Sequence, residues 1–277
     1  MKKFEMIKML SMAIMVLFAI ACSDNEDEVT SLDTDPTAAD LLLSAQVDTT
    51  EDASYAIIEN LYIENVDETH ANVVNSFFAD CALVTVTPNG DGSGSVLVDF
   101  GDSCELTNGA IVSGQVNLEY TIEQGNSRTV MYTYIDFTYN GNEVSGGGTV
   151  QRVFENENGN PQSEVNSAIT IYFPEQDVTA TREANRVREW IEGVGSGTWT
   201  DNAFHVTGSW DTSVSNGFMR SGEVLETLRR EATCPHFVSG TLAITRNNVS
   251  GTLNYGDGVC DNIAIVTIGN QDFTIQL

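Results

Sequence analysis

The sequence predicts a mainly β protein: an antiparallel meander, sandwich or open barrel of about 12 strands, with a short N-terminal helix. Three observations predict this class. From residue 83 onward, segments of alternating apolar and polar residues recur about every 8 to 14 residues. Gly- and Asn-rich turns separate these segments, with no helical pattern between them. The 277 residues include 23 glycines but only 5 prolines, which suits many tight turns.

The first expected element is a helix near residues 52–66. Its apolar side chains Tyr55, Ile58, Tyr62 and Val66 are three or four residues apart, which is helical spacing. We expect this helix to pack on the sheet as a lid or plug. The clearest expected strands are residues 83–87, 95–100, 129–135, 168–173 and 263–268, and the clearest turns are 89–92, 140–142, 158–161 and 247–248. The triplet Val-(Ser/Thr)-Gly recurs at Val112, Val144, Val206, Val238 and Val249, which indicates an internal repeat of β units or chance recurrence at strand edges.

The charge is strongly acidic and unevenly distributed. The chain has 12 Lys+Arg against 40 Asp+Glu, a net charge of -28, which excludes nucleic acid as a natural partner because phosphates would be repelled. All three lysines lie within the first eight residues, and residues 23–127 contain no Lys or Arg. With 41% hydrophobic residues, the composition is that of a folded chain rather than a disordered one.

The N-terminus is typical of an export signal. Lys2, Lys3 and Lys8 precede an uncharged, mostly apolar run over residues 9–21, which is too short to span a bilayer as a helix. Residues 19–22, Ala-Ile-Ala-Cys, resemble a bacterial lipobox, in which Cys22 would be diacylated on sulfur and become the first residue of the mature chain. The alternative is a plain signal peptide that happens to contain a cysteine.

The acidic cluster after Cys22, Ser-Asp-Asn-Glu-Asp-Glu, resembles the lipoprotein export signal of Bacteroidota and implies an outer-membrane lipoprotein exposed at the cell surface. The alternative is an ordinary acidic tether. We therefore divide the chain into a signal peptide (1–21), a lipidated acidic tether (22–50), an N-terminal helical segment (51–80) and a β-rich domain (81–277). Removing residues 1–21 takes away three lysines and Glu5, and so changes the net charge from -28 to -30.

Four cysteines remain after Cys22, and an even number outside the cytoplasm suggests disulfides. Four cysteines allow three connectivities. The midpoint between Cys81 and Cys104 falls in the turn near residue 92, and the midpoint between Cys234 and Cys260 falls at residue 247. Each pair would then sit at the open end of a hairpin, which predicts Cys81–Cys104 and Cys234–Cys260. A zinc site is not expected, because the three histidines (His70, His205, His236) are scattered.

No catalytic residue can be assigned, because the sequence contains none of the common nucleophile, metalloprotease or phosphate-loop motifs. Residues 89–94 resemble the front half of a calcium-binding EF-hand loop, but the twelfth position is Phe100 rather than Glu, which favours a hairpin turn. Calcium nevertheless remains a candidate ligand for so acidic a chain, with Asp257 and Asp261 as its suggested ligands. No other cofactor is expected.

Residues 182–199 offer a candidate ligand-binding patch. Arg186, Arg188, Trp190 and Trp199 could bind a carbohydrate or a carboxylate through guanidinium forks and an aromatic platform. The alternative is structural: the arginines neutralise nearby acids and the tryptophans fill the core.

Residues 98–102, 158–163, 187–193 and 253–258, together with the lipobox and the acidic cluster, resemble a family of uncharacterised flavobacterial surface lipoproteins. The resemblance covers most of residues 80–277 and implies a β-rich surface lipoprotein, but no activity. We expect a non-catalytic domain, anchored through lipid on Cys22, that binds a glycan, a protein or an envelope component. The alternatives are a hydrolase acting on polysaccharide and a purely structural surface protein.

Overall fold

The computed structural model describes residues 38–67, 73–246 and 249–277, with side chains from residue 43 onward. Cys22, His70 and the expected turn at 247–248 lie outside these ranges. Helix α1 spans Ala38–Asn65, and a single 3-10 turn, η1, spans Trp199–Asp201. The strands are β1 (Leu83–Pro88), β2 (Gly94–Asp99), β3 (Cys104–Glu105), β4 (Ile111–Tyr120), β5 (Ser127–Tyr139), β6 (Asn142–Val153), β7 (Gln162–Phe173), β8 (Val178–Glu192), β9 (Ala203–Val214), β10 (Met219–Glu231), β11 (Phe237–Arg246), β12 (Val249–Asp257), β13 (Ile263–Ile268) and β14 (Gln271–Gln276).

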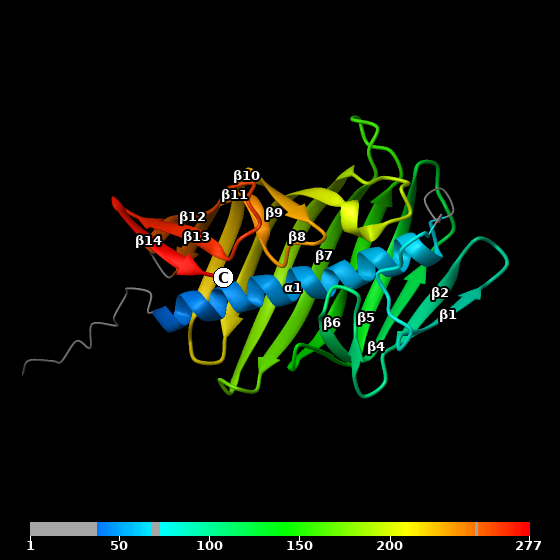
Figure 1. Ribbon diagram of the computed structural model, residues 1–277, viewed down its shortest axis with the longest axis horizontal. Helices are drawn as coiled ribbons and strands as arrows, with labels where there is room; N and C mark the ends of the chain where they lie inside the picture. The colour runs from blue at the N-terminus through cyan, green and yellow to red at the C-terminus, as the bar shows by residue number, and fades with distance from the viewer. Residues whose placement is uncertain (1–37, 68–72, 247–248) are drawn as a thin grey trace, which may run out of the picture. The chain divides into compact units, whose positions relative to one another are not determined.

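The strands form one open antiparallel sheet that follows the chain order. Apart from β3, which pairs with β4, each strand is hydrogen-bonded to its neighbours in sequence, from β1 at one edge to β14 at the other. The fold class predicted from the sequence is confirmed as an open meander, with 14 strands rather than about 12. The sheet curves strongly, and α1 lies across its concave face (Figure 1).

Period-2 alternation determines which side chains face the helix. Strand β7 buries every second residue from Ser163 to Phe173 and exposes most of those between, because successive side chains point to opposite faces. Strands β7 and β8 pair without interruption from Gln162↔Glu189 to Phe173↔Val178. A one-residue slip would turn every buried side chain outward, so the alternation fixes this register.

Helix α1 differs from its prediction in length and position. It begins at Ala38, inside the segment expected to be an acidic tether (22–50), and its residues from Leu43 to Thr50 are almost all buried. It ends at Asn65, so the expected helical segment 51–80 is too long at its C-terminal end, and residues 73–80 form bends and a turn instead. The expected N-terminal helix is therefore confirmed, with 28 residues and an earlier start than the apolar spacing indicates. Because the sheet curves around it, the helix is buried on most sides. A search for a single apolar stripe therefore does not predict its full length.

Two hydrophobic clusters lie inside the sheet. The first contains nearly all of the buried apolar residues of α1, among them Ile57, Ile58 and Leu61, together with side chains of β2 to β8. The second lies on β8 to β13 around Trp210 and Leu242, and Ile63 is its only member from the described part of α1. The helix therefore contributes its apolar side chains mainly to the first half of the sheet.

Both predicted disulfides are confirmed. Cys81 is bonded to Cys104, which ties the chain before β1 to the start of β3. Cys234 is bonded to Cys260, which joins the β10–β11 connection to the β12–β13 connection. Each closes a loop of 23 or 26 residues in sequence separation, and such a bond stabilises a fold by about 3 kcal/mol in the chain-entropy model.

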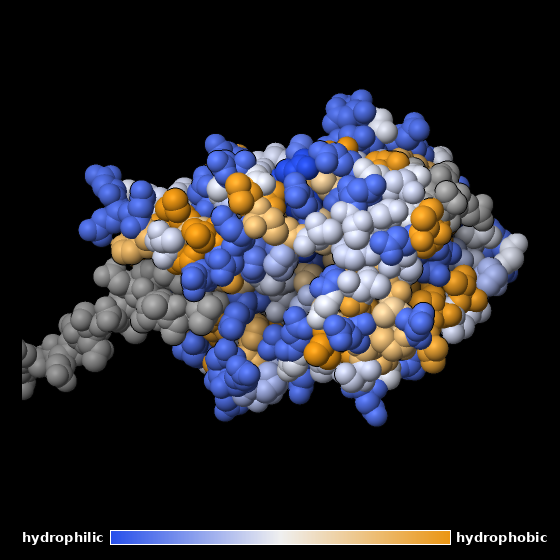
Figure 2. All heavy atoms as spheres, in the orientation of Figure 1, coloured by the Kyte–Doolittle hydropathy of each residue, from blue (hydrophilic) through white to orange (hydrophobic). Residues whose placement is uncertain are grey.

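The surface is mainly hydrophilic on the face shown in Figure 2, with hydrophobic side chains gathered over the C-terminal strands and near β1 and β2. Exposed apolar residues on β13 and β14 include Ile263, Ile265 and Phe273. Within the described ranges, no helix combines the length and the hydropathy needed to cross a bilayer.

Candidate functional site

Helix α1 carries a row of carboxylates towards the second half of the sheet. Glu51 and Asp52 lie three and four residues after Asp48, and Glu59 lies seven residues after Asp52. The four carboxylates, Asp48, Glu51, Asp52 and Glu59, therefore share one side of the helix. All four side chains are at least 89% buried. Buried carboxylates need partners, and these come from the sheet.

Six arginines meet these carboxylates. Arg182, Arg186 and Arg188 lie on β8 at even spacing, so all three point to the concave face. The other three are Arg152 on β6 and Arg220 and Arg230 on β10. We call these six arginines and the four carboxylates the buried ionic network.

Each of the four carboxylates is ion-paired with two arginines. Arg182 forms ion pairs with Asp48, where Nη1 lies 2.8 Å from Oδ1, and with Glu51, where Nε lies 2.6 Å from Oε2. The other oxygen of Asp48 accepts from Arg220 Nη1 at 2.9 Å. Asp52 accepts from Arg188 Nη1 at 2.6 Å and also from Arg230 Nε. These bridges connect α1 to β8 and β10 together.

Near its C-terminal half, the helix is also tied to β6. Arg152 donates to Glu59 and to the hydroxyl of Ser163 on β7, and all three side chains are buried. The guanidinium of Arg152 lies over the ring of Tyr62, 5.1 Å from its centre, which adds a cation–π contact.

Trp210 on β9 supports the network from below. Its ring lies under three guanidinium groups, with Arg186 at 4.3 Å, Arg182 at 4.9 Å and Arg220 at 5.7 Å from the ring centre. The indole can lie here because the residue paired with Trp210 on the neighbouring strand β10 is Gly222. A Cβ added at Gly222 would come within 2.1 Å of the ring. A side chain at position 222 would therefore displace the aromatic base of the network.

The network holds its aspartates as anions. Burial alone would raise the pKa of Asp48, but the charges of Arg220, Arg182 and Arg186 outweigh it and hold that pKa below its ordinary value. For Asp52, Arg188 and Arg230 likewise outweigh burial and lower the pKa strongly. Burial lowers the pKa of Arg186, and although Glu51 acts in the opposite direction and Arg182 in the same one, burial is the larger effect.

The four residues of the predicted ligand-binding patch do not form an exposed platform. Arg186 and Arg188 belong to the buried ionic network. Trp190 is 3% exposed and stacks on Phe204. Trp199 is 7% exposed and makes an edge contact with Phe77. The two tryptophans line a cavity of about 20 Å³, which is too small for a sugar ring. These positions match the structural alternative considered for the patch.

Asp257 and Asp261 lie at exposed positions near the end of β12. Asp261 accepts the backbone N–H of Ile263, which caps the start of β13. No group of three or more potential metal-ligating side chains occurs within residues 38–67, 73–246 and 249–277, so the described neighbours of this pair do not complete a calcium site.

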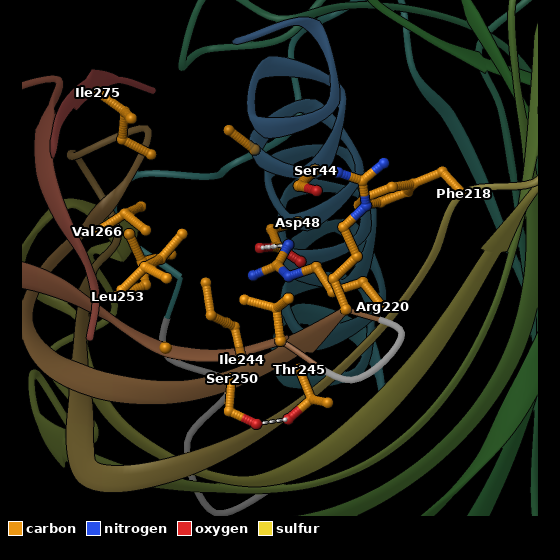
Figure 3. Close-up of a pocket in the computed structure, with 15 residues that line it drawn as sticks. Ser44, Asp48, Phe218, Arg220, Ile244, Thr245, Ser250, Leu253, Val266 and Ile275 are labelled. Carbon is orange, nitrogen blue, oxygen red and sulfur yellow. Dashed lines mark hydrogen bonds and ion pairs between the residues drawn. The ribbon is translucent and has the colours of Figure 1, made fainter. Parts of the chain in front are cut away.

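An apolar crevice opens beside the network, between the first described turns of α1 and strands β10 to β14. Figure 3 shows its two walls. Leu253, Val266 and Ile275 lie on one side, while Ser44, Asp48 and Arg220 lie on the other. The remaining lining residues are Ala45, Phe218, Ile244, Thr245, Arg246, Val249, Ser250, Gly251 and Ile268. The cavity volume is about 40 Å³, so the crevice is a narrow slot.

The polar wall contains two buried atoms with unused hydrogen-bonding capacity. Ser44 is 8% exposed and Arg220 is 7% exposed. Ser44 Oγ and Arg220 Nε have no hydrogen-bond partner among the described residues. Buried polar atoms are nearly always paired in folded proteins, so such exceptions mark a place where a partner is missing. Here both belong to residues that line the same crevice.

No family model matches the chain. No curated protein and no solved structure matches it either. The geometry of the described residues therefore has to support any functional proposal.

Sequence reasoning missed the crevice because its polar wall lies on residues expected to be a tether. The local signal was weak: Leu43, Val47 and Ser54 continue the helical spacing of the later stripe, but Asp48 to Asp52 form an acidic, polar stretch. The apolar wall was visible as the strand at 263–268, whose alternation places Ala264 and Val266 on one face. No pattern of neighbouring residues predicts that these two segments lie against each other.

Proposed function

We propose that the protein is a lipid-anchored, non-catalytic binding domain of the outer-membrane surface, and that its ligand occupies the apolar crevice. The lipobox at Cys22 and the acidic cluster after it support the anchor and the location. The observation that carries the binding function is the crevice itself, where an apolar wall faces a polar wall with unpaired donors.

The size of the crevice restricts what can enter. Its volume of about 40 Å³ lies well below the roughly 300–1,000 Å³ of a pocket that encloses a drug-sized ligand. A slot of this volume encloses only a few methylene groups, so one end of a slender aliphatic chain suits it better than a sugar or an aromatic ring system. Among the partners expected from the sequence, the ligand class is therefore an envelope component with an acyl chain.

Binding rather than hydrolysis is favoured by the state of the carboxylates. A glycosidase needs one carboxyl group held protonated opposite a second carboxylate. The lowered pKa values of Asp48 and Asp52 keep both ionised, and each is already bonded to arginines. Burial does raise the pKa of Glu64, but Glu64 is the only acid among the described residues that line its small cavity.

The anchor can be tested by intact-mass spectrometry of the protein purified from membranes. We expect a mature chain that begins at Cys22 and carries acyl chains, and a Cys22→Ala variant that lacks them and leaves the membrane fraction. Proteinase treatment of whole cells should degrade the wild-type protein if it faces outward. An unacylated mature chain, or protection from proteinase in intact cells, would contradict the corresponding part of the proposal.

The crevice can be tested with the full-length chain carrying Cys22→Ser, which needs no detergent. We expect equilibrium dialysis to show saturable binding of radiolabelled twelve-carbon single-chain amphiphiles. Val266→Trp should abolish it, because the indole fills the slot between Val266 and the polar wall. Leu225→Trp is the matched control, because Leu225 is 57% exposed and is not among the lining residues. Equal binding by Val266→Trp and wild type would place the ligand elsewhere.

A further inference from the structure

The buried ionic network carries more positive than negative charge. Among the described residues, it contains the six arginines 152, 182, 186, 188, 220 and 230 against the four carboxylates of Asp48, Glu51, Asp52 and Glu59. None of these side chains is more than 11% exposed. The chain as a whole has a net charge of -28, so this interior differs in sign from the rest of the molecule. An uncompensated buried charge is unfavourable, and an anion placed beside it would be stabilised.

Arg220 brings this excess charge to the crevice. It gives one nitrogen to Asp48, but Asp48 is shared with Arg182, so one carboxylate serves two guanidinium groups. Nε of Arg220 keeps its proton without an acceptor among the described residues, and Ser44 contributes an unpaired hydroxyl to the same lining. Both groups can donate hydrogen bonds, so they fit a ligand that supplies acceptor oxygens.

The opposite wall selects the rest of the ligand. Leu253, Val266 and Ile275 offer hydrocarbon surface along the slot, and Figure 3 shows them facing the side chains of Asp48 and Arg220. The charges of Asp48 and Arg220 on the polar wall are paired with each other, and its free donors at Ser44 and Arg220 fit an amphiphile whose polar end supplies acceptor oxygens. A carboxylate suits the guanidinium better than a bulkier phosphate ester, because it is planar and compact enough for a slot of this volume.

We propose that the crevice binds the carboxylate end of a free long-chain fatty acid, with the carboxylate at Arg220 and Ser44, the first methylene groups along Leu253, Val266 and Ile275, and the rest of the chain outside the slot. This inference rests on the proposed binding function and specifies its ligand. Phe273 on β14 is 44% exposed and faces the same side of the sheet as Val266, its partner on β13, so it offers apolar surface for the part of the chain outside the slot.

The decisive experiment compares head groups at constant chain length. The full-length Cys22→Ser protein is titrated with dodecanoate, 1-dodecanol and dodecylamine below their micellar concentrations at pH 8. We expect dodecanoate to bind at least about 10-fold more tightly than dodecanol, and dodecylamine to bind most weakly. Equal affinity for the acid and the alcohol, or tighter binding of the amine, would overturn the fatty-acid assignment and leave the binding function standing. Failure of all three to bind would overturn both proposals.

Two serines of α1 provide a matched pair of variants. Ser44 and Ser54 are both buried, and both have a hydroxyl without a partner among the described residues, but only Ser44 lines the crevice. Ser44→Ala should weaken dodecanoate binding by about 5- to 10-fold, whereas Ser54→Ala should leave it unchanged. If the two variants change the affinity equally, the carboxylate does not sit at Ser44. The head-group comparison on the unsubstituted protein remains decisive even where a variant folds poorly.

Discussion

Helix α1 meets the two halves of its sheet in different ways. Towards β2 to β8 it presents apolar side chains such as Ile57, Ile58 and Leu61, which are at most 1% exposed. Towards β8 and β10 it presents Asp48, Glu51 and Asp52, which pair with arginines. The apolar half obtains its stability from non-directional burial. The ionic half depends on geometry, because each buried charge needs a partner at a set position.

This difference indicates where the molecule is built for binding. Close-packed apolar contacts leave few unpaired groups. An ionic interface with six arginines and four described carboxylates leaves some guanidinium N–H groups without an acceptor among the described residues. The crevice lies on the ionic side, bordered by Asp48 and Arg220. We therefore expect the two halves to respond differently to substitution and to pH.

The largest effect is expected from Arg182→Met. Arg182 is fully buried and joins Asp48 to Glu51, so its removal leaves two carboxylates short of a partner. The free energy of unfolding should fall by about 3–5 kcal/mol, measured by urea denaturation of the full-length Cys22→Ser protein.

Arg229→Met is the matched control for this substitution. Arg229 pairs with Glu192 and Glu231 at 2.9 Å, but those carboxylates are 56% and 35% exposed. Its loss should cost less than about 1 kcal/mol. If Arg182→Met lowers the free energy of unfolding no more than Arg229→Met does, Arg182 contributes no more to stability than a surface ion pair. The proposed difference between the two halves of the sheet would then be wrong.

The apolar half is tested by Leu61→Ala. Leu61 is fully buried in the first hydrophobic cluster, so truncation leaves a cavity and should lower the free energy of unfolding by about 3 kcal/mol. Leu225→Ala, at a residue that is 57% exposed, should change it by about 0.5 kcal/mol or less. Because Leu61 does not line the crevice, Leu61→Ala should keep the wild-type affinity for dodecanoate under conditions where the variant is folded. A selective loss of affinity would show that the halves are coupled.

The same contrast explains how much could be read from the sequence. Alternation and turn residues predicted the open antiparallel sheet, because both signals lie within a few neighbouring residues. The disulfides followed from hairpin midpoints for the same reason. The stretch up to Thr50 was interpreted as solvated tether, because Asp48 at its end is buried only by arginines more than 130 positions later, as are Glu51 and Asp52 beyond it. No local pattern reveals such a partner, so both the start of α1 and the crevice beside it were missed.

Acid provides the smallest and most selective test. In the folded state the arginines hold the pKa values of Asp48 and Asp52 below the ordinary 3.8, so their contribution to stability is present above pH 3.8 and is lost as the pH falls below it towards the folded values. We expect the loss between pH 5 and pH 2.5 to be smaller than the loss caused by Arg182→Met. Protonation of the many surface carboxylates acts in the opposite direction by relieving repulsion, so the wild-type curve alone is ambiguous.

Comparing variants removes this ambiguity, because the surface is the same in each. The difference in unfolding free energy between wild type and Arg182→Met should shrink as the pH falls from 5 to 2.5, since the two carboxylates that lose one of their arginines in the variant, Asp48 and Glu51, become neutral. The difference between wild type and Leu61→Ala should stay constant over the same range, because no titrating group is lost from the apolar cluster. Parallel behaviour of the two variants would mean that protonation of the helix carboxylates does not control stability, and that the ionic half is held together by packing in the same way as the apolar half.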